Sequence, residues 1–219
     1  MYVAKEDFLL KLAAGRSVLH LGCVGFTDVA AAERPTLAEQ SLHWKLSRIS
    51  DTVGVDRSLA VIDEYRRGGI FTNIVAGDVE RLEEVEIARK FDVVIAGDII
   101  EHLSNPGRML DGIRRFCDQR TRVVITTPNA FGAPNFLRHS FGKFREGDEH
   151  VLCFNAQNLA TLLERHGYTL SELHTCYQPL SAGKHAGILF GLGRKALEVL
   201  PHFGGTLLAV ARLKPATVC

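Results

Sequence analysis

Acidic residues and a histidine follow several short apolar runs of the sequence. Asp56 ends one run, Asp78 and Asp98 each follow another, and Glu101 and His102 come shortly after Asp98. Carboxylates accept hydrogen bonds from the hydroxyl and amino groups of a ligand, and an imidazole with an ordinary pKa of about 6.5 suits proton abstraction near neutrality. These residues therefore predict a site that binds a polar ligand and moves a proton.

The runs that carry these residues have the composition of buried strands. They are β-branched, apolar on both faces and end in Gly, Asp or Thr, which is typical of parallel strands covered by helices on both sides. The expected strands span residues 17–22, 52–56, 71–77, 91–97 and 121–127. Helical patterns lie between or after them, over residues 36–49, 58–67, 82–89 and 106–118. This alternation predicts a doubly wound, Rossmann-like α/β sheet, whose carboxyl edge gathers the acidic residues.

The flanking parts of the chain complete this domain, which we expect to span residues 1–219 as one unit. A short helix that ends before Gly15 leads into the first strand. A segment at about 128–150, rich in Gly, Pro, Asn and Phe, is expected to form a lid loop. The remaining expected elements are helices over 156–166 and 188–200 and strands over 168–178 and 205–213, the two strands suggesting an antiparallel edge.

Composition narrows the classes of partner and compartment. Lys and Arg number 26 and Asp and Glu 25, so no excess of positive charge predicts binding to nucleic acid. The five cysteines show neither a C-x-x-C spacing nor a disulfide framework, which favours a reducing cytoplasm. No signal peptide pattern is present, and no apolar run approaches the roughly 20 residues of a membrane span. We expect a cytoplasmic monomer or homodimer without stable membrane insertion.

The order of the motifs resembles that of the class I S-adenosylmethionine-dependent methyltransferases. LGC, VGVD, GDVERL, FDVVIAGDIIEHLSNP, VVITTPN and EHVLCFNAQNLATLLERHGY occur in this order between residues 17 and 178. The likeness is to the branch of ubiquinone-biosynthesis O-methyltransferases and of sugar and natural-product methyltransferases. It implies a seven-stranded sheet with an antiparallel last strand, S-adenosyl-L-methionine as cofactor and S-adenosyl-L-homocysteine as product. It also implies a small-molecule acceptor, with O-methylation of a metabolite, sugar or natural-product intermediate.

The resemblance implies a cofactor role for the residues at four strand ends. Gly22 and its turn would approach the methionine part, Asp56 would hold the ribose, Asp78 with Val79 would flank the adenine, and Asp98 would lie beside the methionine. The full set of implied cofactor-binding residues is His20, Gly22, Cys23, Gly25, Asp56, Arg57, Gly77, Asp78, Val79, Asp98 and Ile99.

Two alternatives to this cofactor site stay open. Asp56 is also placed to cap the helix that begins near Ser58. The loop after the first strand departs from the family pattern: His20 replaces an acidic residue, and Val24 and Phe26 replace glycines. These departures are the main support for the alternative of a non-catalytic, cofactor-binding regulatory module of the same fold. An NAD-dependent Rossmann enzyme is disfavoured because no G-x-G-x-x-G motif follows the first strand.

His102 is the first candidate for a catalytic base, since it follows the fourth strand on the expected acceptor side. Glu101 would orient or polarise it, and His150 resembles a position from which relatives point a histidine into the acceptor pocket. A purely structural role at a helix entrance is the alternative for Glu101 and His102. The three residues also offer ligand atoms for a divalent cation, but their spacing matches no recognised metal motif. The sequence therefore predicts no metal.

Overall fold

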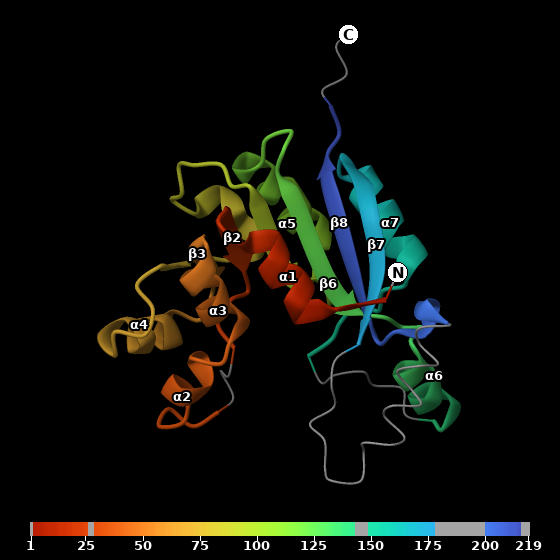
Figure 1. Cartoon of the computed structure of the whole chain (residues 1–219), viewed down its shortest axis with the longest axis horizontal. Coiled ribbons are helices and arrows are strands. Elements are labelled where there is room, and N and C mark those ends of the chain that lie inside the picture. The colour runs from red at the N-terminus through yellow and green to blue at the C-terminus, as the bar shows by residue number, and fades with distance from the viewer. Residues whose placement is uncertain (1, 26–28, 143–148, 178–199, 216–219) are drawn as a thin grey trace.

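A computed structural model describes residues 2–25, 29–142, 149–177 and 200–215, and in these residues the strands form one sheet in the order β1-β7-β8-β6-β5-β2-β3-β4. Figure 1 shows β6 and β7 pointing one way and β8 the other. β8 pairs antiparallel with both β6 and β7, and the other neighbouring strands pair in parallel. The strands are β1 (Tyr2–Ala4), β2 (Ser17–Leu21), β3 (Asp51–Asp56), β4 (Ile74–Ala76), β5 (Val93–Gly97), β6 (Arg122–Pro128), β7 (Tyr168–Tyr177) and β8 (Thr206–Leu213).

The predicted doubly wound sheet and its antiparallel last strand are confirmed, with two differences. The sheet has an eighth strand, because β1 pairs in parallel with β7 through the register Tyr2–Thr175 to Ala4–Tyr177. The two late strands form the expected antiparallel pair, with β8 between β6 and β7, but β1 pairs outside β7 and is the edge strand on that side. β8 is therefore covered on both edges by ladder hydrogen bonds, which removes an exposed strand edge.

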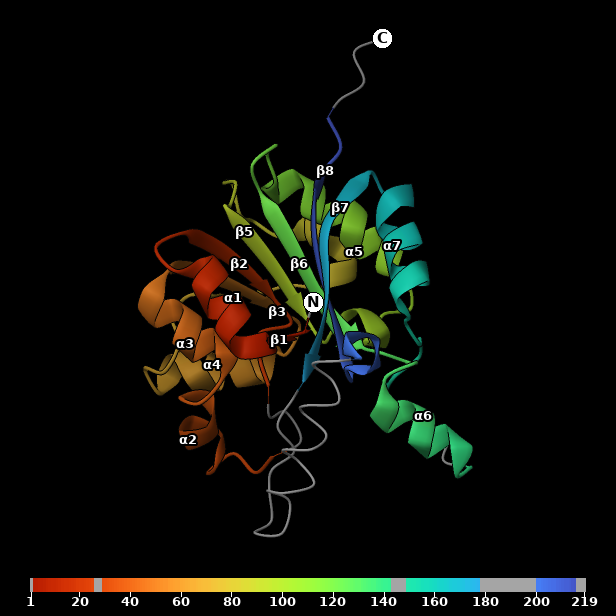
Figure 2. The same cartoon turned by 45° about the vertical axis from the view of Figure 1, so that its right-hand side comes forward.

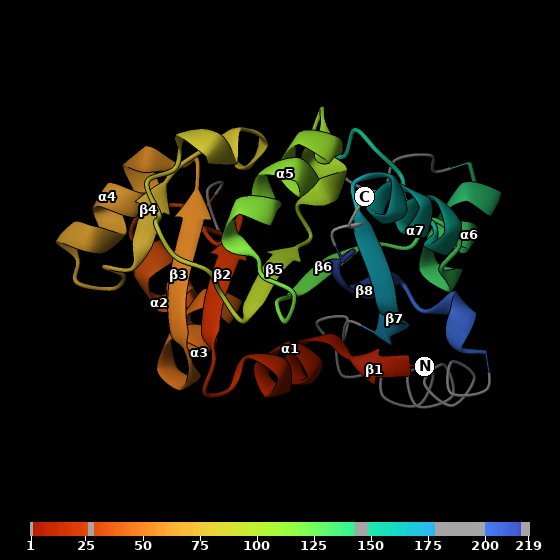
Figure 3. The ribbon, with the colours of Figure 1, turned by 90° about the horizontal axis from the view of Figure 1, so that it is seen from above.

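Helices cover both faces of the sheet. Figure 3 shows α1 and α5 on opposite sides of it. Apolar residues of α1 and α3 pack on one face, and those of α5 and α7 pack on the other. The α-helices are α1 (Lys5–Ala13), α2 (Arg34–Ala38), α3 (Leu42–Ile49), α4 (Leu59–Arg67), α5 (Pro106–Ile113), α6 (Ala133–Ser140) and α7 (Ala156–Arg165). The 3₁₀ turns are η1 (Val79–Glu84), η2 (Ile100–His102), η3 (Arg114–Phe116) and η4 (Pro201–Phe203).

Two of the predicted crossover helices are wrong in their extent. The single helix expected over 36–49 is two helices, because the Ser41 side chain accepts a hydrogen bond from the Trp44 backbone N–H at 3.1 Å and starts α3 anew. The helix expected over 82–89 is the 3₁₀ turn η1, with no helix after it. Arg115 donates to the backbone carbonyls of Leu82 and Val85, oxygens that a continuing helix would use for its own ladder.

Three further expectations concern the C-terminal half. The helix expected over 106–118 ends as an α-helix at Ile113 and continues as η3. The segment expected as a loop at about 128–150 contains α6, which projects past the end of the sheet in Figure 2. The helix expected over 188–200 lies almost wholly outside the described residues. Within the part of the chain that the structure describes, no helix is long and apolar enough to cross a bilayer.

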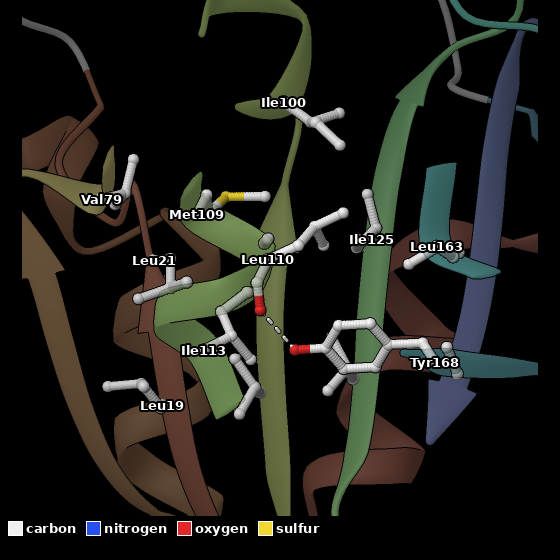
Figure 4. Close-up of a cluster of buried hydrophobic side chains, with 14 of the residues drawn as sticks. Leu19, Leu21, Val79, Ile100, Met109, Leu110, Ile113, Ile125, Leu163 and Tyr168 are labelled. Carbon is white, nitrogen blue, oxygen red and sulfur yellow. Dashed lines mark hydrogen bonds between the residues drawn. The ribbon is translucent and has the colours of Figure 1, made fainter. Parts of the chain in front are cut away.

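The larger face of the core is tied together by the hydroxyl of Tyr168. Tyr168 is fully buried at the start of β7, and its hydroxyl donates to the Leu110 carbonyl of α5 at 2.6 Å (Figure 4). This carbonyl lies in the last turn of α5. The Arg114 backbone N–H, which would be its helical partner, donates to the carbonyls of Asp111 and Gly112. The tyrosine therefore satisfies a helix-end carbonyl that the helix leaves open. Burial raises the pKa of Tyr168, so the hydroxyl stays protonated and keeps donating.

The substitution Tyr168→Phe should destabilise the fold, because it leaves the buried Leu110 carbonyl without its partner. We expect the free energy of unfolding to fall by about 1–3 kcal/mol in urea titrations. Tyr65→Phe is the matched control, since Tyr65 is also buried but its hydroxyl reaches the Gly25 carbonyl only at 3.5 Å. Equal losses in the two variants would show that the Tyr168–Leu110 hydrogen bond does not contribute to the free energy of unfolding beyond the loss of a buried hydroxyl.

Candidate functional site

A cavity of about 240 Å³ opens where β2, β3, β4 and β5 end. Hydrogen-bonded pairing of these four strands brings their carboxyl ends to the same edge of the sheet. Each strand end contributes residues of the cavity wall. The lining residues are Gly22, Val24, Asp56, Arg57, Ser58, Gly77, Asp78, Val79, Glu80, Asp98, Ile99, His102, Leu103, Ser104 and Glu149.

Asp56 joins two of these strand ends. One carboxylate oxygen accepts from the Val24 N–H of the loop after β2 at 2.9 Å, and the other accepts from the Ser58 N–H at 3.0 Å. The side chain is 7% exposed and lines the cavity. The two roles expected of Asp56 are therefore compatible: it holds the start of α4, and it presents a carboxylate to the cavity. Each oxygen keeps a lone pair for a ligand hydroxyl.

Gly22 allows the loop after β2 to turn into the cavity. Its φ of +64° lies in the left-handed region, and a Cβ at this position would overlap the side chain of Ile99. Gly22 also donates its N–H to the Val55 carbonyl of β3 at 2.9 Å. A side chain here would both strain the backbone and push Ile99 away. The close approach of the two loops therefore depends on glycine.

Asp98 holds an unusual conformation at the end of β5. It is the one non-glycine residue with positive φ in the described part of the chain, at +49°. Thr126 donates its hydroxyl to one carboxylate oxygen at 2.8 Å, and Lys5 of α1 forms an ion pair with the other. The left-handed conformation is unfavourable for a non-glycine residue, and such residues are found most often at functional sites. The ion pair connects α1 to the cavity, which sequence reasoning missed because nothing in the sequence shows which strand ends α1 approaches.

A second cavity, of about 280 Å³, lies on the other side of Gly22 and Asp98, which line both cavities. Its floor includes a buried histidine pair, with the Nδ1 atoms of His20 and His43 3.3 Å apart. Burial lowers the pKa of His20 to about 3 and that of His43 to about 4, so both are neutral in the fold at ordinary pH. Trp44 lines neither cavity and packs against Phe71.

All of the expected cofactor-binding residues line these two cavities. Gly22, Asp56, Arg57, Gly77, Asp78, Val79, Asp98 and Ile99 line the first, and His20, Cys23 and Gly25 join Gly22 and Asp98 in the second. Polar residues that were not predicted also line the cavities: Ser58, Glu80 and Glu149 the first, and Lys5 and Glu6 the second. Ser58 and Glu80 each lie two residues after a named acidic residue, and this spacing was the available signal for them.

The three expected catalytic residues come together beside the first cavity. His102 lines it, and one ligand atom each from Glu101, His102 and His150 lies within 4.8 Å of the other two. Glu101 is 1% exposed and accepts a hydrogen bond from the Thr127 hydroxyl at 3.0 Å. Burial raises the pKa of Glu101 to about 7, with the charge of Asp98 acting in the same direction.

The comparisons with known proteins agree with this architecture. A methyltransferase-domain family model matches residues 4–173, and the chain belongs to this family. No curated protein is a significant match. A SAM-dependent methyltransferase from Archaeoglobus fulgidus superposes with a TM-score of 0.57 at 17% identity, over 94% of this chain and 90% of that chain. The N-methyltransferase NodS from Bradyrhizobium japonicum, in complex with S-adenosyl-L-homocysteine, gives 0.56 at 15% identity, over 95% and 85%.

Fold and family together define a class I S-adenosylmethionine-dependent methyltransferase. The residues of the two cavities fit this cofactor. Gly22 leaves the room that a backbone-to-ligand approach needs, and Asp56 offers a buried carboxylate for the hydroxyls of a ribose. Gly22 and Asp98 line both cavities, so the residues expected beside the methionine part of the cofactor border the second cavity as well as the first.

The glycine requirement at Gly22 gives a direct test of the cofactor site. Gly22→Ala should weaken binding of S-adenosylhomocysteine at least about tenfold in calorimetry, because a left-handed alanine costs about 1–2 kcal/mol and its Cβ displaces Ile99. Gly25→Ala, in the same loop, is the control, since a Cβ there meets nothing within 4 Å. Unchanged affinity in Gly22→Ala would remove this loop from the cofactor site.

The buried histidine pair makes stability depend on pH. Below the ordinary pKa of 6.5, His20 and His43 are protonated in the unfolded chain but stay neutral in the folded one. The free energy of unfolding therefore falls as the pH drops from 6.5 towards 4. Each histidine contributes a slope of at most about 1.4 kcal/mol per pH unit.

His43→Gln should reduce this acid slope by about one histidine's share in urea titrations at several pH values. His202→Gln, at an exposed residue, is the control and should keep the slope of the unsubstituted chain. The same slope in all three proteins would mean that the pair is not held neutral in the fold.

Proposed function

We propose that this methyltransferase transfers the methyl group to an oxygen of a small-molecule acceptor that binds beside Glu101, His102 and His150. The observation that carries the proposal is the continuity of one cavity. It runs from the expected adenosyl contacts Asp56 and Asp78 to His102. Acceptor and cofactor would thus share one continuous space, as an in-line transfer requires.

When bound, S-adenosylmethionine supplies a methyl group on a positively charged sulfur, and the S–CH₃ bond breaks with its electron pair staying on sulfur as the acceptor oxygen bonds to the methyl carbon. The chain's own part is alignment and proton removal. The Nδ1 atom of His102 faces the Glu149 carbonyl oxygen at 3.2 Å, and a carbonyl only accepts, so Nδ1 carries the proton and Nε2 is the basic atom. Nε2 takes the proton of the acceptor hydroxyl, while Glu101 and His150 position it.

Three properties of the molecule support a small acceptor. His102 lines a cavity of about 240 Å³, a space on the scale of a small molecule. The net charge of +1 gives no electrostatic attraction to a polyanion. The segment at about 128–150 presents exposed aromatic side chains, with Phe136 59% and Phe141 80% exposed. In this proposal the segment is the lid that receives an apolar part of the acceptor.

The proposed function also fits a reducing compartment. Among the described residues no two cysteines form a disulfide, and three of the four described cysteines, Cys23, Cys117 and Cys176, are buried. Burial raises the pKa of Cys117 and of Cys176 to about 12, which keeps these thiols protonated and unreactive. Both features support the cytoplasm as the site of action.

The test combines cofactor binding with turnover. Calorimetry should show binding of S-adenosylhomocysteine and none of NAD. Transfer of a radiolabelled methyl group to a panel of phenols, sugars and carboxylates should yield an O-methylated product. His102→Gln should slow this transfer about 100-fold or more while leaving the affinity for S-adenosylhomocysteine within about twofold.

Different failures point to different alternatives. A response to NAD alone would replace the methyltransferase by a dinucleotide enzyme. Binding of S-adenosylhomocysteine without any methylated product, from the panel or from a cell extract, would favour the non-catalytic regulatory module. Transfer to nitrogen in place of oxygen would correct the acceptor class. An unchanged rate in His102→Gln would remove His102 from the proton-accepting role.

A further inference from the structure

Glu101, His102 and His150 form a cluster of a kind that binds metal ions. Two imidazoles and one carboxylate offer their ligand atoms within 4.8 Å of one another, although His150 follows His102 by 48 positions in the sequence. A cation bound at about 2 Å from each ligand holds neighbouring ligand atoms at most about 4 Å apart. Small side-chain rotations therefore suffice to bring the three into coordination range. We infer that this cluster binds a divalent cation next to the acceptor end of the cavity.

The surroundings of His102 have the form of a metal-binding histidine. Histidine ligands usually donate their second ring N–H to a carbonyl or carboxylate, which fixes the tautomer and turns the other nitrogen to the metal. The Nδ1 atom of His102 makes this contact with the Glu149 carbonyl at 3.2 Å, so Nε2 is the atom available to a cation.

Glu101 is held in a comparable way. Its Oε2 accepts the Thr127 hydroxyl, and Thr127 is fully buried in β6. The hydroxyl holds one carboxylate oxygen of this 1% exposed side chain in place. A divalent cation would stabilise the ionised carboxylate, which burial alone disfavours.

The backbone brings the third ligand to the first two. The Glu101 carbonyl accepts from the N–H groups of Val151 at 3.0 Å and Leu152 at 3.1 Å, the two residues that follow His150. These bonds tie the segment of His150 directly to the segment of Glu101 and His102. The rings of the two histidines lie edge to face with centroids 4.7 Å apart. The donors are thus arranged before any cation arrives, which lowers the cost of binding it.

The donor set indicates the kind of cation. Two imidazole nitrogens and one carboxylate suit zinc, iron(II), cobalt(II) or manganese(II) better than magnesium or calcium, which prefer oxygen ligands. Three protein ligands also leave coordination positions open, as in catalytic sites. The role of the cation rests on the proposed function: beside the cavity it would hold the acceptor hydroxyl and lower its pKa. With the cation bound, Nε2 of His102 would be a ligand, so the cation would replace His102 in activating the hydroxyl and the proton would pass to solvent.

The test measures cation binding directly, with Co²⁺ as the probe and the full chain stripped by a chelator. We expect one equivalent of Co²⁺ in calorimetry, with a visible absorption spectrum typical of nitrogen ligands. His102→Gln and His150→Gln should each weaken binding more than about tenfold. Thr127→Val keeps all three ligands and the side-chain shape but removes the hydrogen bond to Glu101, and it should weaken binding about tenfold.

Two controls separate this site from casual binding. His166→Gln changes a histidine that pairs with Asp111 outside the cluster, and Cys153→Ser removes an exposed thiol near it. Both should bind Co²⁺ as the unsubstituted chain does. Binding of S-adenosylhomocysteine, measured in every variant, shows that the variant is folded.

The outcomes distinguish this inference from the proposed function. Absence of stoichiometric Co²⁺ binding, or equal binding by His150→Gln and the unsubstituted chain, would overturn the metal site and leave methyl transfer untouched. Co²⁺ binding that depends on both histidines, in a protein that transfers no methyl group, would support the metal site and overturn the proposed function.

Discussion

The carboxylate of Asp56 is the interaction on which the arrangement of the site depends. It accepts backbone N–H groups from the loop after β2 and from the start of α4, so a single side chain ties the ends of β2 and β3 to each other. Burial makes these bonds strong and makes their loss costly. The positive φ of Gly22 and the contact of its loop with Ile99 extend the same connection to the end of β5. The cavity is thus built from strand ends that hold one another.

The sequence predicted the buried strands well, because parallel strands covered on both faces consist almost wholly of apolar residues and need no knowledge of their partners. It predicted helices less well where side chains from elsewhere compete for the backbone. Arg115, distant in sequence, takes the carbonyls that the helix expected over 82–89 would use. The break before α3 had a local signal in Ser41, a common N-cap residue followed by a helical pattern. The eighth strand had none, since three residues are too few to show a period.

The site shows the same division between local and distant information. Residues at strand ends could be located, since the fold alone brings carboxyl ends together. Lys5 could not, because its ion pair with Asp98 depends on the way α1 lies over the sheet. His150 lies close to Glu101 and His102 because backbone hydrogen bonds join their two segments. The spacing of these residues in the sequence does not predict such bonds. The sequence offered the three residues as possible ligands, but only the structure shows that their ligand atoms lie within 4.8 Å of one another.

The pairing of β1 with β7 has a consequence for the order of folding. During synthesis β1 and α1 leave the ribosome before β7, so β1 gains its sheet partner only after β7 has been made. Lys5, which directly follows β1, is fixed beside Asp98 by that late, long-range closure. A nascent chain can therefore assemble β2 to β6 and their cavity while one wall of the second cavity is still missing. Ligand-binding competence would then arrive as one of the last events of chain maturation.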